Sequence, residues 1–188
     1  MGELREPEPV MLIVAAFSSR AHAIDWAYRR LVELYGPVLR ESEPFEFSET
    51  DYYEREMGPG IRLKLLAFER LIRPEQIVEI KLQTNELEWA YTRWQRGAAG
   101  GPEHAGRLLN LDPGYLAGGK FVLATTKDRS HRLYLRRGIF AEVTLYFERG
   151  EFRPWPWTYP NYRRADYREF LKRARAEYLR LVRSGRAG

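Results

Sequence analysis

The chain has 188 residues, a mass of 22.2 kDa and a formal net charge of +5, and 44% of its residues are hydrophobic and 30% charged. This size and composition predict one folded domain and exclude wholesale disorder. The absence of cysteine excludes disulfides, a thiol nucleophile and cysteine-type zinc sites, and no apolar run approaches the roughly 20 residues of a membrane helix. We therefore expect a cytoplasmic protein with no membrane partner.

The charge is unevenly distributed along the chain. Residues 163–188 hold nine Lys or Arg and three Asp or Glu, whereas residues 41–56 hold seven acids and one base. Such a basic tail is typical of a solvated helix face, and it is also compatible with binding to nucleic acid. A third alternative is a homodimer in which the acidic segment of one copy meets the basic tail of the other.

The first half of the chain predicts two strand–helix units. Residues 10–17 are apolar at every position, which is typical of a central strand covered on both faces. A helix then runs to Gly36-Pro37, and strands are predicted over 38–47 and from residue 61. Pro74 begins a second helix, whose predicted buried stripe is Ile77, Ile80, Thr84, Leu87, Tyr91 and Trp94.

This order of elements predicts a ferredoxin-like split βαβ start. Residues 97–106 are rich in glycine and predict a flexible loop. The segment 120–127 fits either a buried strand or a short helix, because its apolar run is too short for periodicity to decide.

A hairpin is predicted around residues 136–138. A three-residue loop there places Leu133 opposite Ala141 and Leu135 opposite Ile139, which gives one wholly apolar face. The same register sets Arg132 across from Glu142, a favourable pairing of opposite charges.

The last part of the chain predicts an aromatic segment followed by a basic helix. Residues 152–162 hold two Trp and two Tyr between prolines, and they either cover the sheet or stack on bases. From Asp166 an amphipathic helix extends through the basic tail (163–188). Together the elements predict a single α+β domain over 1–188, with a mainly antiparallel sheet and helices packed on it.

Familiar catalytic motifs are absent from the sequence. It contains no phosphate-binding loop, no nucleophile elbow and no His-Glu-x-x-His helix, and its three histidines are far apart. We predict no metal site from the histidines, while an all-carboxylate site stays open, and the sequence names no cofactor.

Polar residues occupy several positions inside predicted elements. Lys81, Asn85 and Glu88 recur at helical spacing beside the buried stripe, either as a functional set or as an ordinary helix flank. Asp112-Pro113-Gly114 is a turn signal, and the side chains of Asn110 and Asp112 can bond to their own backbone, so these two residues either stabilise a turn or bind a ligand.

Four potential cations lie within 13 residues, namely Lys120, Lys127, His131 and Arg132. Clustered donors of this kind suit a phosphate or a carboxylate. Of these four, His131 falls on the apolar face of the predicted hairpin, which favours a packed core position. Glu142 is most simply explained as the partner of Arg132. The candidate ligand-binding residues are Lys81, Asn85, Asn110, Asp112, Lys120, Lys127, His131, Arg132, Glu142 and Thr144.

Seven segments taken in order resemble a known prokaryotic family. They are Thr50–Gly58, Glu79–Asn85, Asn110–Tyr115, Leu123–Asp128, Ser130–Tyr134, Ala141–Leu145 and Trp157–Pro160. Together they are similar to the family known as domain of unknown function 4416. The resemblance implies a stand-alone protein of about this length and implies no activity.

The sequence favours one function among three. We expect a protein that binds, or acts on, a small anionic or phosphorylated ligand in a polar cleft, because charged residues inside elements are costly unless they are paired or used. The alternatives are a nucleic-acid-binding module and a non-enzymatic homodimeric interaction protein. Binding and catalysis are not distinguished by the sequence.

Overall fold

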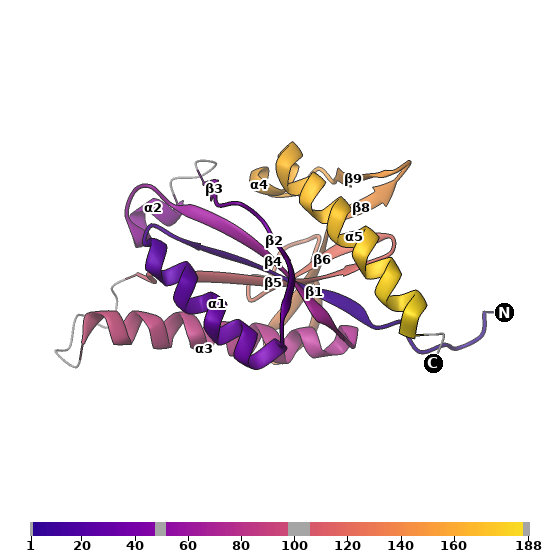
Figure 1. Ribbon diagram of the computed structural model, residues 1–188, viewed down its shortest axis with the longest axis horizontal. Coiled ribbons are helices and arrows are strands. Elements are labelled where there is room, and N and C mark those ends of the chain that lie inside the picture. Colours follow the sequence, from indigo (N-terminus) through magenta and orange to yellow (C-terminus); the bar gives the residue numbers. More distant parts are fainter. Residues whose placement is uncertain (1, 48–51, 98–105, 186–188) are drawn as a thin grey trace.

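The computed structural model describes residues 2–47, 52–97 and 106–185, so most of the loop predicted at 97–106 lies outside the described residues. The described part is a mixed helix and strand domain built on a nine-stranded antiparallel sheet (Figure 1). The predicted single α+β domain with helices packed on a mainly antiparallel sheet is confirmed.

The elements of the first half are β1 (Val10–Ser18), α1 (Ala21–Tyr35), β2 (Val38–Glu41), β3 (Phe45–Glu46), α2 (Tyr52–Met57), β4 (Arg62–Ile72), a 3-10 turn (Pro74–Gln76) and α3 (Ile77–Arg96). Those of the second half are β5 (Asn110–Ala117), β6 (Lys120–Thr125), β7 (Leu133–Arg136), β8 (Ile139–Glu148), β9 (Glu151–Pro154), α4 (Pro160–Arg163) and α5 (Ala165–Gly185). The strands follow the order β2-β4-β1-β5-β6-β8-β7, with β3 paired to β4 and β9 paired to β8.

The sheet is covered on both faces, which explains the uninterrupted apolar run of β1. All nine residues of β1 are buried, and its neighbours β4 and β5 both run antiparallel to it. Helices α1 and α3 pack on one face of the sheet, and α5 packs on the other (Figure 1). A strand with helices on both sides has no face for polar residues, so the prediction of a central strand is confirmed.

Helices α3 and α5 bury most of their predicted apolar stripes. The apolar stripe of α5, from Tyr167 to Val182, packs into the core as expected. In α3, Ile77, Ile80, Thr84 and Tyr91 are buried and Leu87 is half-buried, but Trp94 is 62% exposed and its prediction is wrong. Trp94 lies in the last turn of the helix, three residues before the C-cap Gly97.

The hairpin of β7 and β8 differs from the predicted one in its loop. Leu133 does lie opposite Ala141, but Arg136 rather than Leu135 pairs with Ile139. The loop therefore has two residues, Arg137 and Gly138, and both have positive φ (54° and 76°), as a type I′ turn requires.

The prediction that this hairpin turns an apolar face inward is wrong for β7. Leu133 is 74% exposed and Leu135 40% exposed, whereas Ile139 of β8 is buried. Strand β7 is the last strand in the order of the sheet, so it has a neighbour on only one side.

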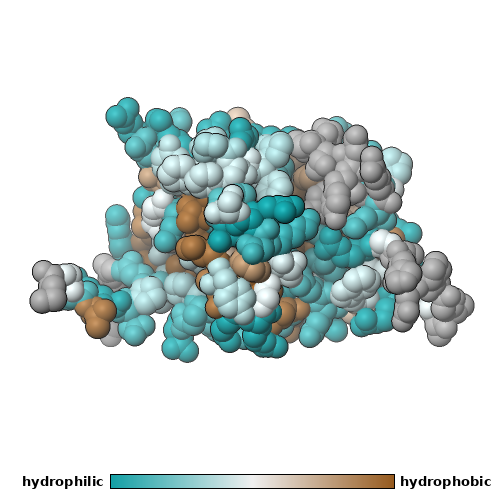
Figure 2. Space-filling view, turned by 180° about the vertical axis from the view of Figure 1, so that it is seen from behind, coloured by the Kyte–Doolittle hydropathy of each residue, from teal (hydrophilic) through white to brown (hydrophobic). Residues whose placement is uncertain are grey.

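The side of the molecule seen in Figure 2 is largely hydrophilic, with a few hydrophobic side chains gathered near its middle.

Two further predictions are settled in the middle of the chain. The ambiguous segment at 120–127 forms strand β6 as far as Thr125. The turn predicted at Asp112-Pro113-Gly114 is wrong, because all three residues lie inside β5 and pair with β1. A proline inside a sheet is unusual, and Pro113 is tolerated here because the pairing of β5 with β6 begins only at Gly114.

Candidate functional site

Strands β5 and β6 separate along their length and leave an opening in the sheet. Their ladder pairs only Gly114–Ala117 with Lys120–Leu123. Residues 110–113 of β5 continue alongside β1, and residues 124–125 of β6 continue alongside β8. We call the opening between these two stretches the β5–β6 gap.

The residues at the closed end of the gap explain why the strands part there. Gly114 approaches β6 so closely that a Cβ atom would lie 2.5 Å from the carbonyl oxygen of Val122, so only glycine fits. The preceding Pro113 has no N–H and cannot donate a ladder hydrogen bond. The sequence Pro-Gly therefore ends the pairing of β5 with β6 instead of forming a turn.

Side chains of α3 take over the backbone hydrogen bonds that β6 no longer makes. The Leu111 N–H donates to Glu88 Oε1 at 2.7 Å, and Lys81 Nζ donates to the Leu111 carbonyl at 3.0 Å. Both side chains are almost fully buried, at 1% and 5% exposure. Since a buried backbone group without a partner is costly, Glu88 and Lys81 allow the gap to stay open.

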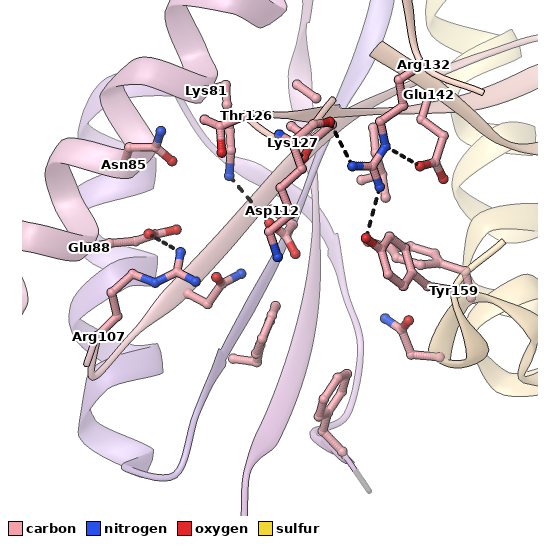
Figure 3. A pocket seen from close by; sticks show the side chains of 18 of the residues that line it. Lys81, Asn85, Glu88, Arg107, Asp112, Thr126, Lys127, Arg132, Glu142 and Tyr159 are labelled. Atoms are coloured by element: carbon pink, nitrogen blue, oxygen red, sulfur yellow. Dashed lines mark hydrogen bonds and ion pairs between the residues drawn. The ribbon is translucent and has the colours of Figure 1, made fainter. Parts of the chain in front are cut away.

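A cavity of about 420 Å³ occupies this region between α3 and the segment at α4 (Figure 3). Its volume lies within the range typical of small-ligand pockets. The wall is mixed, with cations, acids, amides, hydroxyls and a few aromatic rings. The lining residues are Phe17, Phe47, Lys81, Asn85, Glu88, Trp89, Arg107, Asn110, Asp112, Leu123, Ala124, Thr125, Thr126, Lys127, Arg132, Glu142, Tyr159, Pro160, Asn161 and Tyr162.

On the side of the cavity next to α3, which we call the α3 wall, each cation is paired with an acid. Arg107 Nη1 donates to Glu88 Oε2 at 2.9 Å, and Lys81 Nζ lies 3.4 Å from Asp112 Oδ1. Arg107 also lies 3.5 Å from Glu56. Burial raises the pKa of the Glu88 carboxyl above its ordinary value, against the opposing charges of Lys81 and Arg107. This wall is thus rich in charge but close to neutral.

The opposite wall is organised by the Arg132 guanidinium, whose side chain is 2% exposed. Its Nε donates to Glu142 Oε2 at 2.9 Å, its Nη1 to the Lys127 carbonyl at 2.8 Å and its Nη2 to the Tyr159 hydroxyl at 2.9 Å (Figure 3). Three hydrogen bonds hold the plane of the guanidinium. Because arginine has five N–H donors, two of them have no partner among the described residues.

Two residues support this wall without lining the cavity. His131 Nε2 lies 3.2 Å from Glu142 Oε2, and the Thr144 hydroxyl donates to Glu142 Oε1 at 3.1 Å. Glu142 is 1% exposed, so both of its oxygens are engaged inside the protein. The ring of His131 also stacks on Trp157, with centroids 5.5 Å apart. His131 is therefore half-buried at the surface instead of packed in the core.

One buried polar group on the cavity wall has no partner. Asn110 is 2% exposed, and its Nδ2 makes no hydrogen bond within the described residues. Asn110 pairs with Phe17 of β1, so the two side chains lie on the same face of the sheet. An unsatisfied buried amide at a cavity wall is the arrangement expected where a ligand or water completes the bonding.

The structure brings most of the predicted candidates together. Seven of the ten line the cavity, and His131 and Thr144 contact Glu142 from behind. The exposed Lys120 does not line it, because it begins β6 whereas the cavity lies beside the end of that strand. Lys81 and Glu88 do not meet through Asn85 but through the backbone of Leu111.

Several lining residues were missed from the sequence. Arg107 directly follows the glycine-rich loop, and nothing in its local pattern distinguishes it from a solvated arginine. Tyr159 belongs to the aromatic segment (152–162), for which the sequence predicts only stacking on bases or covering of the sheet. Its contact with Arg132 joins residues 27 positions apart, which no periodicity can indicate.

Metal and membrane sites are not found in the described residues. No group of three or more His, Asp or Glu side chains there is placed to hold a metal ion. Among the described helices, none combines the length and apolar character needed to cross a bilayer.

The fold and the cavity define an α+β domain with a charged internal pocket at an opening in its sheet. The chain belongs to the family of domain of unknown function 4416 (DUF4416), whose profile matches residues 8–178. No curated protein and no solved structure matches the chain, so the ferredoxin-like start stays a prediction.

Proposed function

We propose that the protein binds a small anionic compound, a phosphate ester or a carboxylate, in the cavity of the β5–β6 gap. The observation that supports this most directly is the buried Arg132 guanidinium, which is fixed by three hydrogen bonds and keeps two N–H donors. Planar donors of this kind recognise phosphate and carboxylate oxygens in pairs.

Neighbouring groups strengthen the case for an anion. Lys127 lines the cavity beside Arg132, and the hydroxyls of Thr125 and Thr126 belong to the same stretch of wall. The Tyr159 hydroxyl accepts a hydrogen bond from Arg132, which leaves its own proton to donate elsewhere. The wall thus offers cationic and neutral donors close together.

A thermal-shift screen tests this proposal. Wild-type protein is heated with inorganic phosphate, phosphate esters and small carboxylates at constant ionic strength. A ligand at 100 times its Kd stabilises the folded state by about 2.7 kcal/mol, which raises the Tm of a protein of this size by roughly 5–10 °C. We expect at least one compound to reach this range.

Variants identify the site. Arg132→Gln removes the charge and should abolish the shift, whereas Arg30→Gln, on the exposed face of α1, should retain it. If Arg132→Gln does not fold, Lys127→Gln provides the second variant, since Lys127 is exposed at the cavity wall and its change should weaken the shift several-fold. A shift that is equal in all variants, or no shift with any anion, contradicts the proposal.

The alternatives of nucleic-acid binding and homodimer formation stay predictions. Affinity for RNA that falls steeply with salt and is unchanged by Arg132→Gln would favour the first of them. A concentration-dependent mass in solution would favour the second.

A further inference from the structure

We infer that the ligand is a phosphate ester that also carries neighbouring hydroxyl groups, of the class of sugar phosphates and other phosphorylated polyols. This inference rests on the proposed function, because it takes the anion to lie at Arg132. It is carried by a second set of polar groups on the cavity wall, namely Asn85, Asn110 and Asp112, which we call the amide–acid pole.

The amide–acid pole has unused hydrogen-bonding capacity of both kinds. Asp112 Oδ1 faces Lys81, while its Oδ2 has no partner in the described part of the chain. The Asn110 Nδ2 is an unpartnered donor, and the half-buried Asn85 also makes no hydrogen bond there. One acceptor-only carboxylate oxygen thus lies among amide groups that can both donate and accept.

The spacing of these groups suits one ligand. Asn110 and Asp112 are two residues apart in β5, so their side chains project on the same face, about 7 Å apart along the strand. A hydroxyl group both donates and accepts, so adjacent hydroxyls can donate to Asp112 while accepting from Asn110.

The charges around this pole discriminate between hydroxyls and amines. A protonated amine would also satisfy Asp112, but Lys81 lies 3.4 Å from that carboxylate and Arg107 lines the same wall. Because Lys81 already pairs with Asp112 and Arg107 with Glu88, the wall is close to neutral, and a third positive charge would lose its hydration there without a free counter-charge, whereas a neutral hydroxyl has a much smaller desolvation cost. The pole therefore favours uncharged donors.

The amide–acid pole faces the same cavity as the wall formed by Arg132, Lys127 and Tyr159, which we call the anion pole. Figure 3 shows Asp112 between the α3 side chains on one side and Arg132 with Tyr159 on the other. A second anionic group next to Asp112 would be disfavoured, which also argues against a ligand that carries a separate anionic group at each end. One anionic end and one hydroxylated end match the two walls.

The test compares phosphate esters with and without hydroxyl groups next to the phosphate-bearing chain. Affinities of wild-type protein for butyl phosphate, glycerol phosphate, ribose 5-phosphate, glucose 6-phosphate and a ribonucleoside monophosphate are measured by isothermal titration calorimetry at one ionic strength. Two additional hydrogen bonds predict roughly ten- to hundredfold tighter binding of the hydroxylated esters than of butyl phosphate. The sugar and nucleoside arms distinguish which source of hydroxyls fits.

Substitutions at the pole separate this inference from the proposed function. Asp112→Asn should weaken binding of the hydroxylated esters several-fold and leave that of butyl phosphate unchanged or stronger, because a negative charge is removed. Asn110→Ala should act in the same direction. Arg132→Gln should weaken all esters alike.

The affinities distinguish failure of the hydroxyl inference from failure of the proposed anion site. If butyl phosphate binds as tightly as the sugar phosphates, or if Asp112→Asn weakens every ester equally, the hydroxyl inference is wrong while the anion site stands. If no phosphate ester binds but a carboxylate does, the inference is wrong and the anion site stands; if neither class binds, the proposed function itself fails.

Discussion

The buried pair of Arg132 and Glu142 allows a sharp prediction about stability. Their side chains are 2% and 1% exposed, and Nε and Oε2 lie 2.9 Å apart. Removing one member leaves the other charge buried with incomplete pairing, so Arg132→Met and Glu142→Leu should each lower the free energy of unfolding by about 3–5 kcal/mol.

The double variant should be much more stable than the two single costs together suggest. It leaves no uncompensated charge in the core, and apolar replacements of buried ion pairs are often tolerated. If the double change costs no more than one of the single changes, the coupling energy is about 3–5 kcal/mol. Urea denaturation of the four proteins measures it.

An exposed pair provides the matched control. Arg30 and Glu33 on α1 also form an ion pair, at 2.8 Å, but their side chains are 51% and 61% exposed. The same cycle there should give a coupling of about 0.2–1 kcal/mol, since solvent screens the interaction. A coupling for Arg132 and Glu142 that is no larger than this control would refute the buried geometry of the anion pole.

Three further predictions concern the gap and the core. Gly114→Ala forces a Cβ against the Val122 carbonyl and should lower the free energy of unfolding by about 1–3 kcal/mol or more in urea denaturation. Gly119→Ala is the control, because Gly119 has open space around it, and it should change stability by less than about 0.5 kcal/mol. Equal effects of the two substitutions would contradict the close approach of Gly114 to β6. Burial raises the pKa of Glu88 in the folded protein above its ordinary value of 4.5. Just above pH 4.5 the folded protein therefore binds more protons than the unfolded chain, so the free energy of unfolding should fall as the pH rises through this range. Glu88→Gln should lose this slope, and an unchanged slope would show that another group causes it. The buried Tyr91 hydroxyl has no partner in the described residues, so Tyr91→Phe should raise the midpoint of thermal unfolding, and a clear decrease would indicate a hydrogen bond that the structure does not contain.

The parts of the fold that could be predicted are those set by local patterns. The uninterrupted apolar run of β1 indicates a strand buried on both faces, and the stripe of α5 indicates a helix buried on one face, so the pattern of apolar residues was sufficient. The pairing of Arg132 with Glu142 followed from hairpin register, even though the loop has two residues and not three. A bulge at Leu135 absorbs the difference and leaves the nearby pairs in place.

The gap could not be predicted because its cause is a contact between strands. Asp112-Pro113-Gly114 is a strong turn signal, and only the close approach of Gly114 to β6 reveals why it lies in a strand. The spacing of Lys81 and Glu88 is equally typical of a solvated helix flank, because their partner, the backbone of Leu111, lies on a different element. Arg107 and Tyr159 reach the cavity through tertiary contacts alone.

The most direct test is a crystal structure of the protein with the tightest-binding phosphate ester from the calorimetric series. The account predicts electron density in the cavity of the β5–β6 gap, with phosphate oxygens within hydrogen-bond distance of the Arg132 guanidinium. A phosphate bound elsewhere on the molecule, with this cavity holding only water, would contradict it.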